Sequence, residues 1–170
     1  MGWFEATYVW GPPSKVWAPH IVFWGRYIDD IFIIWTGTEA LLLSFIEHLN
    51  SNSYFLKFSS NFSRCEITFL DITIFVDGTK LGSKLFRKET SCNSVLHFES
   101  AHPRNQVRSI PYAEMIRIRR NCSHDRDFFE TLSNLEGCFL NRGYNRTDIR
   151  RASKRAKLLN RASLLRDVPK

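Results

Sequence analysis

The run Tyr27-Ile28-Asp29-Asp30 constrains the fold of this 170-residue chain more than any other feature of its sequence. It lies between two apolar runs, residues 21–24 and 31–35, whose β-branched and aromatic side chains are typical of buried strands. Acids at the junction of two such strands predict the tip of a tight β-hairpin. Paired aspartates on a rigid hairpin can hold Mg²⁺ ions against phosphate groups. Two solvated acids at a surface turn need no metal, and this is the alternative.

A helix and further strands follow the hairpin in the sequence. Thr38 suits a helix N-cap, and apolar residues then repeat at helical spacing, so a helix is predicted over about residues 39–50. Short strands are predicted over residues 54–58, 67–75 and 80–88. Asp77-Gly78 between the last two is typical of a hairpin turn. A helix packed on mainly antiparallel strands predicts an α+β fold.

The C-terminal part of the chain has a helical pattern. Pro111 suits the first turn of a helix, Ser123 suits the N-cap of the next helix, and Gly143 suits its left-handed end. A last helix is predicted to begin near Thr147. Two helices joined by residues 142–145 have the outline of a helix-turn-helix.

Positive charge is concentrated in this helical part. Residues 1–103 carry 8 Lys and Arg against 10 Asp and Glu, whereas residues 104–170 carry 16 against 7, for a net charge of +7. A basic surface indicates a polyanionic partner, with nucleic acid first and an acidic membrane second. The candidate phosphate contacts on the last helix are Arg150, Arg151, Lys154, Arg155 and Lys157. A solvated helix face is the alternative, and no pattern in these residues identifies a base.

Several blocks of sequence occur in an order that resembles a known family. The blocks are FWGRYIDDIF at residues 23–32, ITFLDI at 67–72, LFRKET at 85–90, SAHP at 100–103, IPY at 110–112 and FLNRGY at 139–144. On these blocks the chain resembles the reverse transcriptases of Penelope-like retroelements, which are retrotransposons, over roughly residues 1–155.

The resemblance implies RNA-directed DNA polymerase chemistry. Asp29 and Asp30 would be catalytic metal ligands that hold part of a two-Mg²⁺ site. The partners would be an RNA template and a DNA primer, no membrane partner is expected, and the protein would be intracellular and nuclear. Further nucleic-acid contacts are expected at Lys84, Arg87, Lys88, Arg117 and Arg120. For the three cations on the predicted hairpin, exposed strand charges that blunt a sheet edge are the alternative.

Three parts of the chain follow from the resemblance. Residues 1–100 would be the C-terminal part of a palm, with an antiparallel palm-type sheet and a packed helix. Residues 101–160 would be an all-α, basic thumb that contains the helix-turn-helix-like pair, and residues 161–170 a basic tail.

A complete reverse transcriptase also needs an aspartate from an earlier palm strand, and Glu5 is the only acid that precedes Asp29. The chain is therefore expected to be a fragment of the polymerase that is inactive alone. One alternative function is a non-catalytic helix-turn-helix module that binds nucleic acid. Another is a relic that folds poorly, because dividing a palm leaves unpaired strand edges.

Three smaller expectations complete the sequence-based description. Asp71 could join a metal site, but a structural, hydrogen-bonded role is expected for it. The four cysteines lie far apart without a C-x-x-C pair, so free thiols are predicted. No apolar run approaches the roughly 20 residues that a membrane-spanning helix needs.

Overall fold

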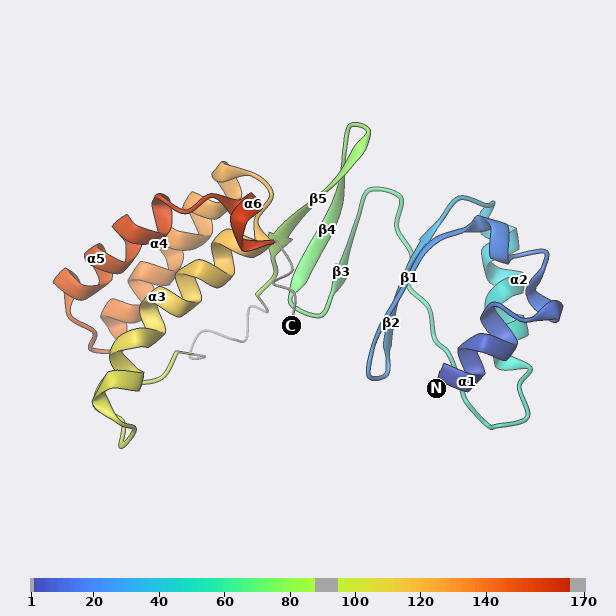
Figure 1. Cartoon of the computed structure of the whole chain (residues 1–170), viewed down its shortest axis with the longest axis horizontal. Coiled ribbons are helices and arrows are strands. Elements are labelled where there is room, and N and C mark those ends of the chain that lie inside the picture. The colour runs from blue at the N-terminus through green and yellow to red at the C-terminus, as the bar shows by residue number, and fades with distance from the viewer. Residues whose placement is uncertain (1, 88–94, 166–170) are drawn as a thin grey trace. The chain divides into compact units, whose positions relative to one another are not determined.

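The computed structural model describes residues 2–87 and 95–165 of the chain, and its residues form two compact units, Met1–Ser63 and Arg64–Lys170. The described residues combine antiparallel sheets with a helical C-terminal part (Figure 1), which agrees with the predicted α+β class. The predicted functional boundary near residue 100 stays a prediction. By contacts, the strands after residue 63 group with the C-terminal helices.

The first unit begins with a series of short helical turns. They are α1 (Gly2–Phe4), the π-helix η1 (Glu5–Val9), and the 3₁₀ turns η2 (Pro12–Ser14) and η3 (Ala18–His20). Phe4 and Val9 are buried and pack with Phe45 and Leu49 in a small core.

The predicted hairpin is confirmed by strands β1 (Ile21–Tyr27) and β2 (Asp30–Trp35). The strands pair antiparallel from Ile21↔Trp35 to Tyr27↔Asp30, so two residues, Ile28 and Asp29, form the turn. Ile28 has a φ of 55°, in the left-handed region that β-branched residues rarely occupy. The turn that carries the acids is therefore a tight one, with backbone strain at its first residue.

The predicted helix over residues 39–50 is confirmed as α2 (Glu39–Asn50), with Oγ1 of Thr38 accepting a hydrogen bond from the Leu41 N–H. The strand predicted over residues 54–58 is wrong. The side-chain amide of Asn50 instead bonds both backbone groups of Phe58, at 2.7 and 2.9 Å, and Asn52 does the same for Leu56, at 3.2 and 2.8 Å. These side-chain amides satisfy the backbone N–H and C=O groups of Leu56 and Phe58, which in a strand would bond to a neighbouring strand.

The second unit begins with an antiparallel sheet. Its strands are β3 (Glu66–Phe69), β4 (Ile72–Asp77) and β5 (Lys80–Leu85), in the order β3-β4-β5. The single strand predicted over residues 67–75 is wrong, because the chain turns at Leu70 and Asp71 and pairs Phe69 with Ile72. Leu70 takes a φ of 56°. Glycine or asparagine usually occupies such a turn position, and neither is present here, so the sequence does not indicate the turn. The next hairpin forms as expected, and Gly78 supplies its positive φ of 60°.

Helices α3 (Arg104–Asn121) and α4 (Asp125–Asn141) differ in their starts from the prediction. Pro111 lies inside α3 rather than in its first turn. Pro111 is buried, as are Val107 one turn before it and Met115 one turn after it. The buried side of α3 therefore includes a residue that has no backbone N–H to donate. Ser123 does not cap α4 either, because its Oγ accepts a hydrogen bond from the Ser83 N–H of β5 at 2.7 Å.

Two further helices complete the second unit, α5 (Arg146–Lys157) and α6 (Arg161–Leu164). The predicted basic tail therefore begins in a folded turn, and residues 166–170 of that tail lie outside the described residues. The buried side chains that join α3, α4 and α5 are Val95, Val107, Met115, Ile118, Cys122, Phe128, Leu132, Leu135, Phe139, Tyr144, Ile149, Ala152 and Ala156.

Candidate nucleic-acid interface

A tight turn sets the direction in which α5 leaves α4. Gly143 takes a φ of 80°, its N–H bonds the Leu140 carbonyl at 3.1 Å, and the Tyr144 N–H bonds the Phe139 carbonyl at 3.1 Å. This pair of bonds is the Schellman arrangement, so the left-handed helix end predicted at Gly143 is confirmed. The Asn145 side chain then caps α5 by accepting from the Thr147 N–H at 2.7 Å.

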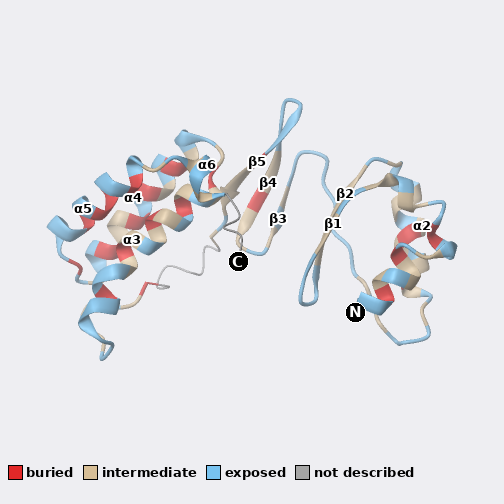
Figure 2. Cartoon of the chain, viewed as in Figure 1, coloured by how far each residue is buried: buried red, intermediate tan, exposed pale blue. Residues whose placement is uncertain are grey.

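One face of α5 is buried and the rest is basic. Ile149, Ala152, Ser153 and Ala156 are buried, and Figure 2 shows the buried and exposed residues on different sides of the helix. The exposed positions hold six cations and one acid, namely Arg146, Arg150, Arg151, Lys154, Arg155, Lys157 and Asp148. The five candidate contacts predicted on this helix are thus all exposed together, and Arg146 joins them.

Two features hold α5 against α3. Ala152, Ser153 and Ala156 are small, which lets the two helices approach closely. The guanidinium of Arg155 lies over the Tyr112 ring of α3, 4.0 Å from its centroid. A cation stacked on a ring in this way adds about 0.5–1 kcal/mol at an exposed site. The orientation of the basic helix is therefore fixed by packing on one side and by a stacked arginine at its border.

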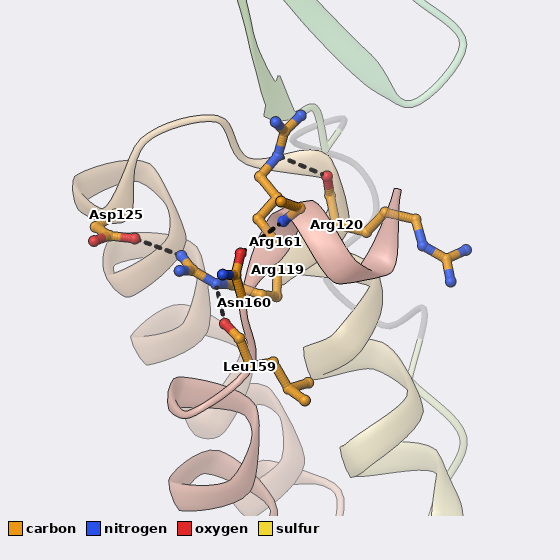
Figure 3. Close-up of polar contacts among 7 residues, drawn as sticks. Arg119, Arg120, Asp125, Leu159, Asn160 and Arg161 are labelled. Atoms are coloured by element: carbon orange, nitrogen blue, oxygen red, sulfur yellow. Dashed lines mark hydrogen bonds and ion pairs between the residues drawn. The ribbon is translucent and has the colours of Figure 1, made fainter. Parts of the chain in front are cut away.

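The end of α3 also holds the segment that follows α5 (Figure 3). Nε of Arg119 donates to the Leu159 carbonyl at 3.0 Å, and its terminal nitrogen pairs with Asp125 at the start of α4. Nε of Arg161 donates to the carbonyl of Arg120 at 3.0 Å. The exit of α5 is therefore tied to the turn between α3 and α4.

Of the two α3 residues predicted to contact nucleic acid, Arg117 already has partners. It pairs with Asp71, from the turn between β3 and β4, and with Glu114 at 3.4 Å. The hydrogen bond that Arg117 donates to Asp71 is the largest cause of the raised pKa of Arg117. The structural role expected for Asp71 is confirmed. Arg120 is exposed, and only its backbone carbonyl takes part in the contact with Arg161.

The predicted contacts on the hairpin are only partly described. Lys84 of β5 bonds Glu66 of β3 at 3.2 Å and lies over the ring of Phe75, 5.6 Å from its centroid. This ion pair reaches across β4, and it fits the alternative, an exposed charge on a strand, better than a cation available to contact nucleic acid. Arg87 is half-buried just after β5, and Lys88 lies outside the described residues.

Asp29 and Asp30, the predicted metal ligands, lie together at the tip of the first hairpin and are exposed. Arg26 approaches the same tip and donates to the Ile28 carbonyl at 3.0 Å and to Glu5 at 2.7 Å. Glu5 is therefore an ion-pair partner of Arg26. Two adjacent carboxylates match the number of carboxylate ligands, one or two, that a protein usually supplies to Mg²⁺. No group of three His, Cys, Asp or Glu that could hold a metal occurs in residues 2–87 and 95–165.

The cysteines and a buried tyrosine complete the description of the ionisable groups. Cys65, Cys122 and Cys138 form no disulfide, as predicted, while Cys92 lies outside the described residues. Burial raises the pKa of the Cys122 thiol and of the Tyr144 hydroxyl, which keeps both protonated at neutral pH. No helix in the described part of the chain is long and apolar enough to cross a membrane.

Sequence reasoning missed Arg146, because it placed the start of the last helix near Thr147. Arg146, Arg150 and Lys154 are spaced by four residues, which places them on one side of a helix. This spacing could have identified Arg146 as part of the basic face. Asn145, one residue earlier, is a good N-cap type and marks the observed start.

Comparison with known proteins gives one finding. A family model, the animal helix-turn-helix domain, matches residues 94–154, which include α3, α4 and most of α5. No curated protein and no solved structure matches the chain. The matched region is less than half of the chain, and it contains the helix pair joined by residues 142–145.

Proposed function

We propose that the helical part of the chain is a non-catalytic helix-turn-helix module that binds nucleic acid. The observation that carries the proposal is the exposed face of α5, on which six cations accompany one acid. The similarity of residues 94–154 to an animal helix-turn-helix domain supports it, because the second helix of such a pair is the one that enters or follows a groove.

The charge of the unit points to the same partner. Residues 64–170 hold 21 Lys and Arg against 12 Asp and Glu, whereas residues 1–63 hold 3 against 5. A surplus of cations displaces the counterions that surround a phosphate backbone, and their release drives binding. A nuclear location would follow from a DNA partner, and it belongs to this proposal.

Fluorescence anisotropy with the full chain tests the proposal. A labelled 20-base-pair DNA duplex is titrated at salt concentrations from 50 to 200 mM. We expect binding that weakens steeply with salt, because each phosphate contact contributes about −0.9 to the slope of log K against log salt. An absence of binding at 50 mM salt, or an affinity that does not depend on salt, would contradict the proposal.

A second function concerns the first hairpin. We propose that the unit of residues 1–63 derives from the metal-holding hairpin of a reverse transcriptase palm, of the kind found in Penelope-like retroelements. The support is the position of Asp29 in the two-residue turn and of Asp30 at the start of β2, together at the tip of a hairpin of two apolar strands. In this function Asp29 and Asp30 would hold Mg²⁺, which supplies charge neutralisation for phosphoryl transfer when it is bound.

The rest of the hairpin has a positioning role in this second proposal. The contacts of Arg26 with Glu5 and with the Ile28 carbonyl fix the base of the turn, and so fix the two carboxylates relative to the strands. With two carboxylates and no third acid grouped with them among the residues described, we expect the chain alone not to extend a primer on an RNA template. A primer-extension assay with Mg²⁺ or Mn²⁺ tests this, and templated synthesis that Asp29→Asn abolishes would show a complete active site.

A further inference from the structure

The exposed cations of α5 fall into two groups around the helix. At about 100° per residue, Arg146, Arg150, Lys154 and Lys157 lie within about 80° of one another on one side of the exposed face, and we call them the outer edge. Arg151 and Arg155 lie on the other side of the exposed face, which we call the α3-side edge, because Arg155 contacts Tyr112 of α3. The two edges differ in how their charges are compensated.

The α3-side edge is occupied by interactions within the protein. Arg155 is stacked on Tyr112. Asp148 precedes Arg151 by three residues and Arg155 by seven, so its carboxylate lies on the same side of α5 and offsets part of their charge. Moving Arg155 onto a phosphate would remove it from the ring. This edge therefore has a small net charge, and one of its two cations is held in place.

The outer edge has no such compensation. All four of its side chains are exposed, and none forms an ion pair with any residue in the part of the chain that the structure describes. Every charge on this edge is positive. From Arg146 to Lys157 the twelve residues of α5 cover about 16 Å of helix axis, a length over which one strand of a duplex presents about five phosphates.

We infer that α5 contacts a single phosphate strand of nucleic acid through the outer edge, and that the α3-side edge only holds the helix in place. The inference rests on the proposed nucleic-acid-binding function. Between its four cations, the outer edge carries no Asn, Gln or acidic side chain of the kinds that select adenine or cytosine. Arg and Lys can contact guanine as well as phosphate, but four cations in one row match a row of phosphates, so the inferred contact is with the phosphodiester backbone and does not depend on base sequence.

Two double variants of the full chain test the inference, and they are matched because each removes two exposed cations from the same helix. R150Q/K154Q changes the outer edge and R151Q/R155Q changes the α3-side edge. Glutamine keeps most of the side-chain length and suits a helix. Affinity is measured by anisotropy on three probes, a DNA duplex, an RNA duplex of the same sequence and single-stranded DNA, from 50 to 200 mM salt.

We expect R150Q/K154Q to weaken binding at 100 mM salt by roughly 10- to 100-fold and to reduce the salt slope by about 1.8, which corresponds to two lost phosphate contacts. R151Q/R155Q should weaken binding clearly less than R150Q/K154Q does and should reduce the salt slope by less. The ranking of the three probes identifies which nucleic acid supplies the backbone. A duplex of permuted sequence should bind within about threefold of the first one.

The outcomes separate the inference from the proposed function. If both double variants weaken binding equally, or neither does, or a permuted duplex binds more than tenfold differently, the outer-edge inference is wrong while nucleic-acid binding stands. If the unmodified chain binds none of the three probes, both fail. Circular dichroism of each variant checks the fold, and if R151Q/R155Q unfolds, the single variants R150Q and R151Q make the same comparison.

Discussion

The guanidinium of Arg155 lies 4.0 Å from the centroid of the Tyr112 ring, and this contact joins the basic helix α5 to α3 across 43 residues of sequence. It separates a cation that stabilises the fold from the neighbouring cations that face solvent. Removing this contact tests how much it contributes to the packing of α5 on α3.

Replacing Tyr112 with Leu should lower the free energy of unfolding of the helical unit by about 0.5–1 kcal/mol, because the apolar contact remains in part while the attraction between ring and cation is lost. Tyr112→Phe is the control, since it keeps the ring, and it should change stability much less. Urea unfolding followed by circular dichroism measures both. Equal losses for the two variants would show that the ring face contributes nothing.

A second test concerns the ion pair between Asp71 and Arg117, which ties the β3–β4 turn to α3. Both side chains are close to half exposed, at 44% and 47%, so the pair should contribute only about 0.2–1 kcal/mol. A double-mutant cycle with Asp71→Asn and Arg117→Gln measures the coupling energy. Salt at 1 M should reduce that coupling, and a coupling above about 2 kcal/mol would contradict a surface pair.

The first unit should lose stability in acid through Glu5. Burial raises the pKa of this carboxyl, but the hydrogen bonds from Arg26 and Trp24 and the charge of Arg26 outweigh burial, so its pKa lies below the usual 4.5. A carboxyl with a lowered pKa adds stability above its unfolded-state pKa, and this stability is lost as the pH falls through the folded-state value. The relevant window is therefore at and below about pH 4.5.

The variant Glu5→Gln should lower the free energy of unfolding of this unit at pH 7 by about 0.5–1 kcal/mol and flatten its loss of stability in acid. All five tryptophans lie within residues 1–63, so tryptophan fluorescence reports on this unit alone. Glu47→Gln is a matched control, because Glu47 is exposed on α2 of the same unit. If both variants behave alike, the Glu5–Arg26 contact does not stabilise the fold.

Local sequence patterns predicted the elements whose local and tertiary preferences agree. The helix capped by Thr38 and the turn at Gly143 have residues that suit their own backbone conformation. The hairpin with Asp29-Asp30 at its tip was predicted from the apolar strands on either side, although Ile28 in its turn takes a strained conformation. The candidate cations of α5 were also found, because a helix with one apolar side displays its charges on the other.

Long-range contacts decided the rest. Nothing local marks a turn at Leu70, and the turn is held by the contact of Asp71 with Arg117 and by a bond from the Phe86 N–H to the Asp71 carbonyl. Ser123 resembles a helix cap, but it pairs with Ser83, 40 residues earlier in the sequence. The division of the α5 cations into two edges likewise depends on Tyr112. A sequence pattern cannot supply partners that only the folded chain brings together.

The turn between α4 and α5 provides the last prediction. Gly143 has a φ of 80°, and a β-carbon there would meet its nearest neighbour, a ring atom of His97, at an ordinary 3.6 Å, so backbone strain alone opposes a side chain. Gly143→Ala should therefore lower the free energy of unfolding of the helical unit by about 1–2 kcal/mol.

Gly137 is a matched control within α4, because a β-carbon there meets nothing within 4 Å and its φ is not positive. Gly137→Ala should raise the free energy of unfolding by about 0.5–1 kcal/mol, since alanine favours a helix interior. Urea unfolding followed by circular dichroism measures both changes. The two substitutions add the same methyl group, so opposite signs isolate the left-handed turn as the cause, and a Gly143→Ala variant as stable as the unmodified chain would show that the turn can be made another way.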